Sequence, residues 1–114
     1  MISIIIPSFN RYDNLLNAIS SVKNQTYKDY EIIVVSDGST DKRYLQEIEK
    51  VKIIRLSKSS KQKLGYPCGA IPRNEGIKQA KGEYICFLDD DDIWMPNKLE
   101  IQIVQMKKNN IDVS

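Results

Sequence analysis

The sequence of 114 residues contains no histidine, and its two cysteines, Cys68 and Cys86, are widely separated. Zinc sites are built mainly from grouped cysteine and histidine ligands, so the absence of histidine and of any CxxC pair excludes such a site from this segment. The same absence excludes a histidine general base. Two separated cysteines are typical of free thiols in a reducing compartment.

A strong excess of one charge and long apolar runs are also missing. The net charge of +2 is too small to indicate nucleic acid or an anionic membrane as the main partner. Residues 1–7 (MISIIIP) lack the basic start and the length of a signal peptide, and no stretch approaches the length of a membrane span. We therefore expect a cytoplasmic chain, and its length suits one domain rather than two.

Short aliphatic runs alternate along the chain with patterns of helical period. The runs predict strands at 2–6, 32–35, 51–56 and 84–88. The helical patterns predict helices beginning near Asp13, around Leu45 to Ile48, from Ile71 to Ala80 and from Pro96 to Met106. This alternation predicts an α/β, Rossmann-like fold, in which helices flank a mainly parallel sheet and ligands bind at the carboxyl ends of the strands.

Two segments fall outside this alternation. Residues 57–69 predict a polar loop, and its lysines, Lys58, Lys61 and Lys63, are interpreted as a solvated run. Residues 111–114 have the pattern of the beginning of another strand. We therefore expect residues 1–114 to form a single but truncated domain.

Four consecutive aspartates, Asp89 to Asp92, follow the last predicted strand directly. Neighbouring carboxylates repel one another and cost folding free energy unless a cation lies among them. Oxygen ligands at the carboxyl end of a strand suit Mg²⁺ or Mn²⁺ that holds a phosphate-bearing substrate. The alternative is an acidic turn that caps the next helix, but one aspartate would suffice for that. We therefore favour a metal site.

Two more polar segments follow predicted strands, at 7–10 and at 37–41. In a parallel sheet these segments and the aspartates lie along one edge. Asp37 would accept a hydrogen bond from a nucleobase or a ribose hydroxyl, or else form an ordinary Asx turn. Gly38 would allow the backbone to approach a ligand closely, or simply adopt a turn with positive φ. The convergence of three such strand ends predicts a ligand site more strongly than any one of them.

Four motifs follow one another along the chain with characteristic spacing. They are Ile4-Ile5-Ile6-Pro7-Ser8-Phe9-Asn10, Asp37-Gly38-Ser39-Thr40-Asp41, Arg73-Asn74-Glu75-Gly76-Ile77 with Ala80 and Gly82, and Phe87-Leu88-Asp89-Asp90-Asp91-Asp92 with Trp94, Pro96 and Leu99. Each motif alone is weak. Together, over residues 2–106, they resemble the nucleotide-sugar-binding half of a family 2 glycosyltransferase, which has the GT-A fold.

The resemblance implies nucleotide contacts at several positions. Pro7, Phe9 and Asn10 would line the nucleotide pocket, with Phe9 packing near the base. Asp37 would bind the base of the donor, which is usually uracil in this family. Arg73, or a lysine of residues 58–63, would reach the base or the phosphates. A position on the surface of its helix is an equally good interpretation of Arg73.

The resemblance also divides the roles of the aspartates. Asp91 would coordinate a Mg²⁺ or Mn²⁺ ion that bridges the diphosphate, and Asp89, the first carboxylate of the motif, would support it as a second metal ligand. Asp90 would meet the ribose or the metal shell. Asp92 is expected to cap the helix that begins at Pro96, and Trp94 to anchor that helix rather than to stack on a ligand.

The function implied by the resemblance is transfer of a sugar, with inversion, from a UDP-sugar to a saccharide or glycolipid acceptor in cell-surface polysaccharide or glycolipid synthesis. Peripheral membrane association of the full-length protein would fit such an acceptor. No residue of 1–114 matches the family's general base, which we expect beyond Ser114. The alternative is therefore a nucleotide-binding module without catalysis. A Mg²⁺-dependent phosphohydrolase is disfavoured because no aspartate follows the first strand, and a dinucleotide-binding domain because no GxGxxG follows Ile6.

Overall fold

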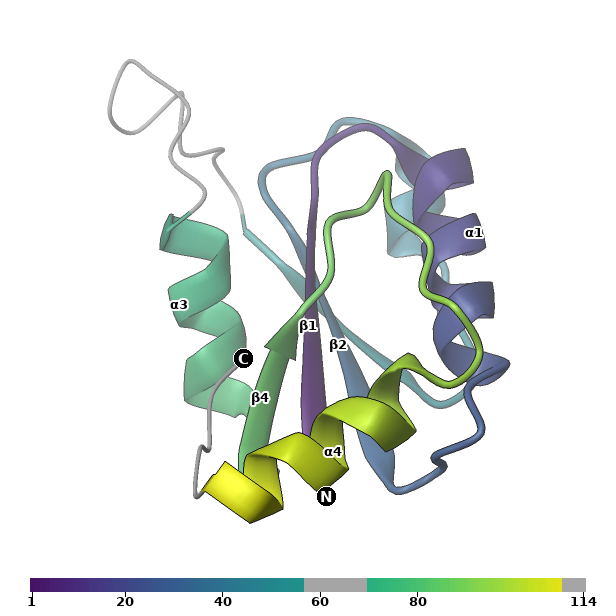
Figure 1. Ribbon diagram of the computed structural model, residues 1–114. Coiled ribbons are helices and arrows are strands. Elements are labelled where there is room, and N and C mark those ends of the chain that lie inside the picture. Colours follow the sequence, from purple (N-terminus) through teal and green to yellow (C-terminus); the bar gives the residue numbers. More distant parts are fainter. Residues whose placement is uncertain (57–69, 110–114) are drawn as a thin grey trace.

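The computed structural model describes residues 1–56 and 70–109. Its strands are β1 (Ile2–Ser8), β2 (Tyr30–Ser36), β3 (Val51–Arg55) and β4 (Tyr84–Phe87). Its helices are α1 (Tyr12–Lys23), the short 3₁₀ helix η1 (Lys42–Leu45), α3 (Ala70–Gln79) and α4 (Lys98–Asn109). The strands pair in the order β3-β2-β1-β4, and every pairing is parallel (Figure 1). The predicted Rossmann-like α/β fold with a parallel sheet is confirmed.

Strand β1 continues through Pro7 to Ser8, whereas the sequence predicts that it stops at Pro7. The carbonyl of Ile5 accepts a hydrogen bond from Leu88 on the β4 side, whereas the carbonyl of Ser8 accepts one from Asp37 on the β2 side. Because backbone groups alternate in direction along a strand, the nitrogen of Pro7 faces the β4 side. The β4 pairing ends there at Ile5 and Phe87, so the missing N–H costs no ladder bond.

Two of the predicted helices differ from the observed ones. The helix predicted at Leu45 to Ile48 is wrong, because the chain forms the 3₁₀ helix η1 instead, with Leu45 69% exposed. The side chain that η1 buries is Tyr44, whose ring packs edge-on against Tyr12 at 5.2 Å between centroids. The last helix begins at Lys98, two residues later than predicted.

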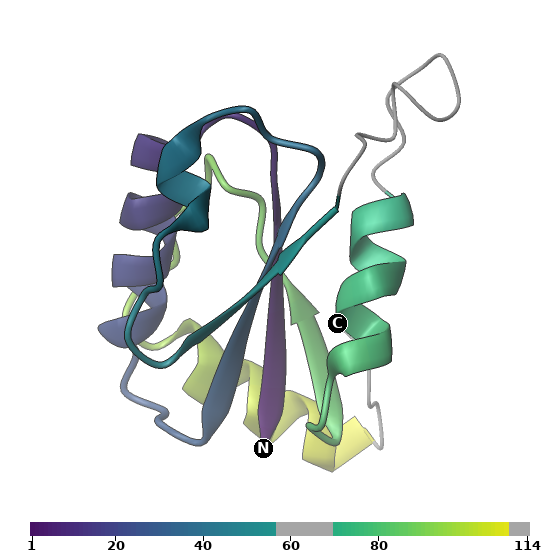
Figure 2. The same cartoon turned by 180° about the vertical axis from the view of Figure 1, so that it is seen from behind.

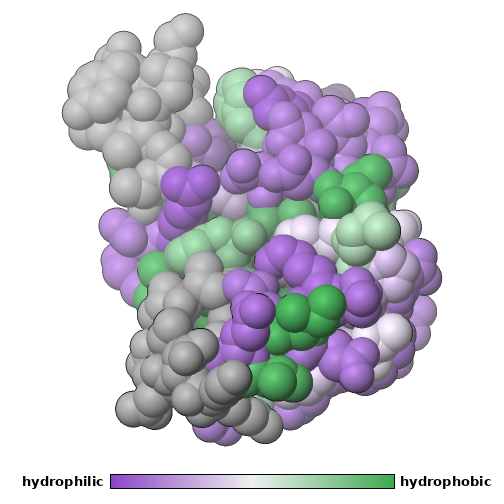
Figure 3. All heavy atoms as spheres, in the orientation of Figure 1, coloured by the Kyte–Doolittle hydropathy of each residue, from purple (hydrophilic) through white to green (hydrophobic). Residues whose placement is uncertain are grey.

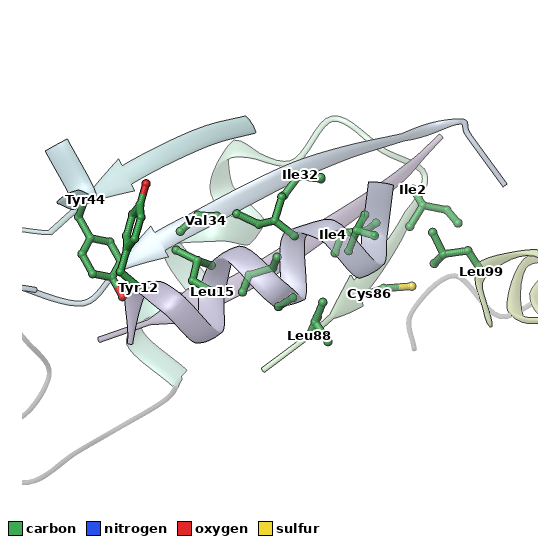
Figure 4. Close-up of a cluster of buried hydrophobic side chains, with 14 of the residues drawn as sticks. Ile2, Ile4, Tyr12, Leu15, Ile32, Val34, Tyr44, Cys86, Leu88 and Leu99 are labelled. Atoms are coloured by element: carbon green, nitrogen blue, oxygen red, sulfur yellow. The ribbon is translucent and has the colours of Figure 1, made fainter. Parts of the chain in front are cut away.

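The two faces of the sheet are covered by different helices (Figure 2). On one face, even-numbered residues of β1 pack against α1 and α4, in a cluster that also contains Cys86 and Leu88 (Figure 4). On the other face, Ile5, Ile33 and Val35 form a smaller buried cluster next to α3. Strand β1 is therefore buried on both faces, which is the reason for its almost continuous aliphatic sequence.

Helix α3 approaches the sheet through a glycine. A Cβ atom added at Gly76 would lie 2.5 Å from Cγ2 of Ile5, closer than two carbon atoms can pack. The backbone of α3 therefore lies directly on β1, and this contact fixes the position of the helix that carries Arg73.

The first turn of α4 is held by a buried amide, that of Gln25. Its Nε2 donates to the carbonyls of Met95 and Ser21, at 2.6 and 3.2 Å, and its Oε1 accepts from the backbone N–H of Leu99 at 3.0 Å. Because the first N–H groups of a helix have no partner within the helix, Gln25 acts as its cap. The segment after the aspartates is thereby fixed to the end of α1.

Exposed apolar side chains gather on α4 and on the segment before it. These side chains are Ile93, Met95, Ile101 and Val104, and part of the apolar surface over α4 is visible in Figure 3. Within residues 1–56 and 70–109, no helix is long and apolar enough to cross a membrane. The predicted loop at 57–69 and the strand-like pattern at 111–114 lie outside the described residues.

We predict that Gly76→Ala destabilises the fold, because the new methyl group would overlap Ile5. Overpacking costs about 1–3 kcal/mol, against a gain of about 1 kcal/mol from the helix preference of alanine. Urea denaturation should therefore show a net fall in unfolding free energy of up to about 2 kcal/mol. Ile77→Ala, at an exposed position of the same helix, is the control. A Gly76→Ala protein more stable than the wild type would contradict this packing.

Candidate functional site

The predicted convergence of three strand ends is observed at the carboxyl edge of the sheet. The chain runs from β1 to β2 and β3 on one side and returns to β4 on the other side of β1, so the strand order reverses beside β1. Ligands of open α/β sheets bind at such a point. The loops after β1, β2 and β4 meet there, at the top of Figure 1, and the N–H of Asp37 donates to the carbonyl of Ser8 at 2.9 Å.

One of the four aspartates, Asp90, is buried and holds these loops together. It is 5% exposed, and its Oδ2 accepts a hydrogen bond from the Ser8 hydroxyl at 2.9 Å. The same hydroxyl lies 2.5 Å from the hydroxyl of Tyr44. The Tyr44 oxygen in turn accepts the backbone N–H of Arg11 at 3.0 Å. A continuous polar network thus joins β1, η1, the start of α1 and the aspartate loop.

Burial raises the pKa of Asp90 above the usual range of an aspartate. The hydroxyl of Ser8, the guanidinium of Arg11 and the N–H of Phe9 act in the opposite direction, and the neighbouring Asp91 adds to the rise. These donors favour the charged form of a carboxylate that burial would otherwise neutralise. The charged form of Asp90 is therefore stabilised by groups at the end of β1 and in the loop after it.

The other three aspartates form an exposed cluster. Asp89, Asp91 and Asp92 each offer a carboxylate oxygen, and these atoms lie within 4.8 Å of one another. An all-oxygen set of this kind fits Mg²⁺ or Mn²⁺. The structure thus brings together the two predicted metal ligands, Asp89 and Asp91, and adds Asp92.

The prediction that Asp92 caps the last helix is wrong. That helix begins at Lys98, and the side chain that caps it is Gln25, which accepts the N–H of Leu99. The backbone N–H of Asp92 instead donates to the carbonyl of Asp89 at 3.0 Å, so the aspartates form a tight turn. The turn directs Asp92 to the same cluster as Asp89 and Asp91.

Two arginines border this cluster, Arg11 just before α1 and Arg73 in α3. Nη1 of Arg11 lies 3.4 Å from Asp90 Oδ1 and 3.5 Å from Asp91 Oδ2. Nη2 of Arg73 lies 3.4 Å from Asp89 Oδ1, with its guanidinium 5.7 Å from the centre of the Phe87 ring. Arg73 therefore lies beside the aspartate cluster, and its predicted contact with the base or the phosphates stays a prediction.

The residues predicted for the nucleotide pocket lie beside this cluster. Asn10 has a positive φ of 51°, and its side-chain oxygen accepts the N–H groups of Thr40 and Asp41 at 2.9 and 3.0 Å. It therefore joins the loop after β1 to the loop after β2. Phe9 next to it is 47% exposed, and Pro7 is half-buried.

The predicted base-binding segment, 37–41, forms a turn. Asp37 is half-buried, and Gly38 has a φ of 73°, a conformation that favours glycine. Asp41 caps η1 by accepting the N–H of Arg43 at 3.0 Å. Asp37 therefore lies at the carboxyl edge of the sheet, between the end of β2 and the turn at Gly38.

Trp94 packs at the start of α4, in agreement with the prediction that it anchors this helix. Its ring is partly buried against the main hydrophobic cluster, with Nζ of Lys98 4.3 Å from the ring centre. Its backbone N–H donates to the hydroxyl of Ser21 at 3.2 Å. The tryptophan therefore belongs to the packing of α4.

Sequence reasoning missed two polar residues of this edge, Arg11 and Tyr44, and the cap that Gln25 provides for α4. It placed Ser8 in the pocket-lining stretch 7–10 but did not predict its hydrogen bond to Asp90. Arg11, Tyr44 and Gln25 carry no local signal, because their partners are distant in sequence. The burial of Asp90 did have a signal. Leu88 and Asp90 are buried while Asp89 and Asp91 are exposed, so the period-two alternation of β4 continues into the aspartates.

Comparison with known proteins gives consistent matches over nearly the whole chain. The family model described as Glycosyl transferase family 2 matches residues 3–114. The chain is 43% identical over 114 residues to the UDP-Glc:alpha-D-GlcNAc-diphosphoundecaprenol beta-1,3-glucosyltransferase WfgD of Escherichia coli, covering 97% of this chain and 43% of that protein. It is 41% identical over 115 residues to the poly(ribitol-phosphate) beta-N-acetylglucosaminyltransferase TarP of Staphylococcus aureus, covering 98% of this chain and 35% of that protein.

A solved structure agrees with these sequence matches. The crystal structure of S. aureus TarS 1-349 in complex with UDP-GlcNAc superimposes with a TM-score of 0.77 at 27% identity, covering 96% of this chain and 32% of that chain. The chain therefore spans less than half the length of each of these relatives.

We predict that Asn10→Ala loosens the junction between the loops after β1 and β2. The change removes the side-chain hydrogen bonds to Thr40 and Asp41 and places alanine at a φ that it rarely adopts. The unfolding free energy should fall by about 1–3 kcal/mol, and the amide hydrogens of Thr40 and Asp41 should exchange faster. Asn10→Asp, which keeps the acceptor oxygen and loses only the bond that Nδ2 donates to Thr40 Oγ1, should lose clearly less stability than Asn10→Ala. Unchanged exchange in Asn10→Ala would show that Asn10 does not order this loop.

Proposed function

This chain belongs to glycosyl transferase family 2, and from that membership we propose that it binds a UDP-sugar together with Mg²⁺ or Mn²⁺ for transfer of the sugar to an acceptor hydroxyl. The resemblance to family 2 glycosyltransferases that the sequence motifs indicate is thereby confirmed. The observation that carries the proposal is the exposed carboxylate cluster of Asp89, Asp91 and Asp92 at the switch point of the sheet. Ligand sites of open parallel sheets lie at this position.

The charges at the edge suit a nucleoside diphosphate donor. Asp89, Asp91 and Asp92 would hold the ion. When bound, Mg²⁺ or Mn²⁺ supplies the positive charge that offsets the negative charge of the diphosphate leaving group. The guanidinium groups of Arg11 and Arg73, at the two sides of the cluster, provide further positive charge toward the phosphates.

The nucleoside is assigned to the loops after β1 and β2. Asp37, at the end of β2, would accept a hydrogen bond from the base, and the exposed ring of Phe9 would pack near it. Asn10 keeps the two loops at a fixed separation. Asp90 is proposed to contact the ribose from its place beneath the loops.

The choice of UDP and of a saccharide or glycolipid acceptor is supported by the relatives. The similar protein of Escherichia coli is named for UDP-Glc and a diphosphoundecaprenol-linked acceptor, and the similar TarS structure holds UDP-GlcNAc. Inverting transfer requires a general base opposite the leaving group. We assign that base, and the acceptor contacts, to residues outside 1–114, since the chain spans less than half of these relatives.

The test is calorimetric titration of UDP, GDP, CDP and ADP into the purified protein, with and without Mn²⁺. We expect UDP to bind best, and binding to weaken by about tenfold or more, ~1.4 kcal/mol, without Mn²⁺ or in Asp91→Asn. Asp29→Asn, at the opposite end of β2, is the matched control and should bind as the wild type does, because the Asp29 carboxylate pairs with the amino terminus, away from the cluster. Equal binding without metal, or no binding of any nucleotide, would refute the proposed function.

A further inference from the structure

Arg11 occupies the position at which a cation and a diphosphate would meet. Its backbone is fixed by the hydrogen bond from its N–H to the hydroxyl of Tyr44, while its side chain is 56% exposed. The guanidinium lies 3.4 Å from Asp90 and 3.5 Å from Asp91. Arg11 is therefore the counter-ion of a carboxylate that is also assigned to the metal.

The other cations near the edge are differently engaged. Arg43 pairs with Asp13 and Asp41, both at 2.8 Å and away from the cluster. Arg73 pairs with Asp89 at 3.4 Å, and Nζ of Lys98 lies over the ring of Trp94. Among residues 1–56 and 70–109, Arg11 is the residue whose ion pair competes most directly for Asp91.

Two consequences follow from this geometry. A guanidinium at ion-pair distance from Asp91 repels a divalent cation that approaches the same carboxylate. Because the Arg11 side chain is more than half exposed, it is free to turn from Asp91 to another anion near the edge. A diphosphate is such an anion, and it would offset the charges of both Arg11 and the cation.

We propose that Arg11 couples the two ligands, so that the cation binds strongly only when the diphosphate is present. In the empty site Arg11 neutralises Asp91 and opposes the cation, and with the donor bound it pairs with a phosphate instead. Coupling of this kind is reciprocal, since each ligand raises the affinity for the other by the same factor. Arg11 is thus a donor-binding residue, and this inference rests on the proposed function.

The test measures the affinity for Mn²⁺ with and without saturating UDP, by the electron paramagnetic resonance of free Mn²⁺, and the affinity for UDP by calorimetry. In Arg11→Gln we expect Mn²⁺ alone to bind about three- to tenfold more tightly. UDP should bind about tenfold less tightly, because a charge-assisted contact is lost. The coupling factor, the ratio of the two Mn²⁺ affinities, should therefore fall, while Arg11→Lys keeps most of it.

Arg43→Gln changes the net charge equally without touching the cluster, and it should leave the coupling factor unchanged. A purely structural role of Arg11 would weaken both affinities, so changes of opposite sign distinguish coupling from damage. An unchanged coupling factor in Arg11→Gln, or a weaker affinity for Mn²⁺ alone, overturns the inference. Absence of metal-dependent UDP binding in the wild type would instead refute the proposed function.

Discussion

The arrangement of the candidate site depends on the buried hydrogen bond between Ser8 Oγ and Asp90 Oδ2, at 2.9 Å. The two residues are 82 positions apart in sequence, and the bond joins the end of the central strand to the loop after the edge strand. A buried carboxylate without donors is costly, so the loop keeps this conformation only while Ser8 and Arg11 remain in place. Tyr44 extends the same network to the loop after β2.

This bond gives four identical side chains two different environments. Once Asp90 points inward, the alternation of the extended chain turns Asp89 and Asp91 outward, and the tight turn that follows adds Asp92. The exposed carboxylates are close enough to repel one another, and the nearby arginines reduce that repulsion. Three exposed carboxylates are thus gathered at the place where this fold binds ligands, and this supports the proposed divalent cation.

Much of this could be predicted from the sequence, because the features concerned are local. The aliphatic runs of β1 and β2 and the polar residues that follow them identify a parallel sheet and its binding edge. Gly38 and Gly76 mark places where only a small residue fits or a positive φ is needed. The remainder is tertiary. The cap that Gln25 provides for α4, and the burial of Tyr44 in place of Leu45, depend on which segments become neighbours.

The central claim is that Asp90 supports the loops from within while the other three aspartates face the cation. Anomalous diffraction from crystals grown with UDP and Mn²⁺ tests it most directly. The account predicts a manganese peak coordinated by Asp91 and by at least one of Asp89 and Asp92, with Asp90 still hydrogen-bonded to Ser8. A manganese ion bound by Asp90 with that hydrogen bond broken, or no manganese at this edge, would contradict it.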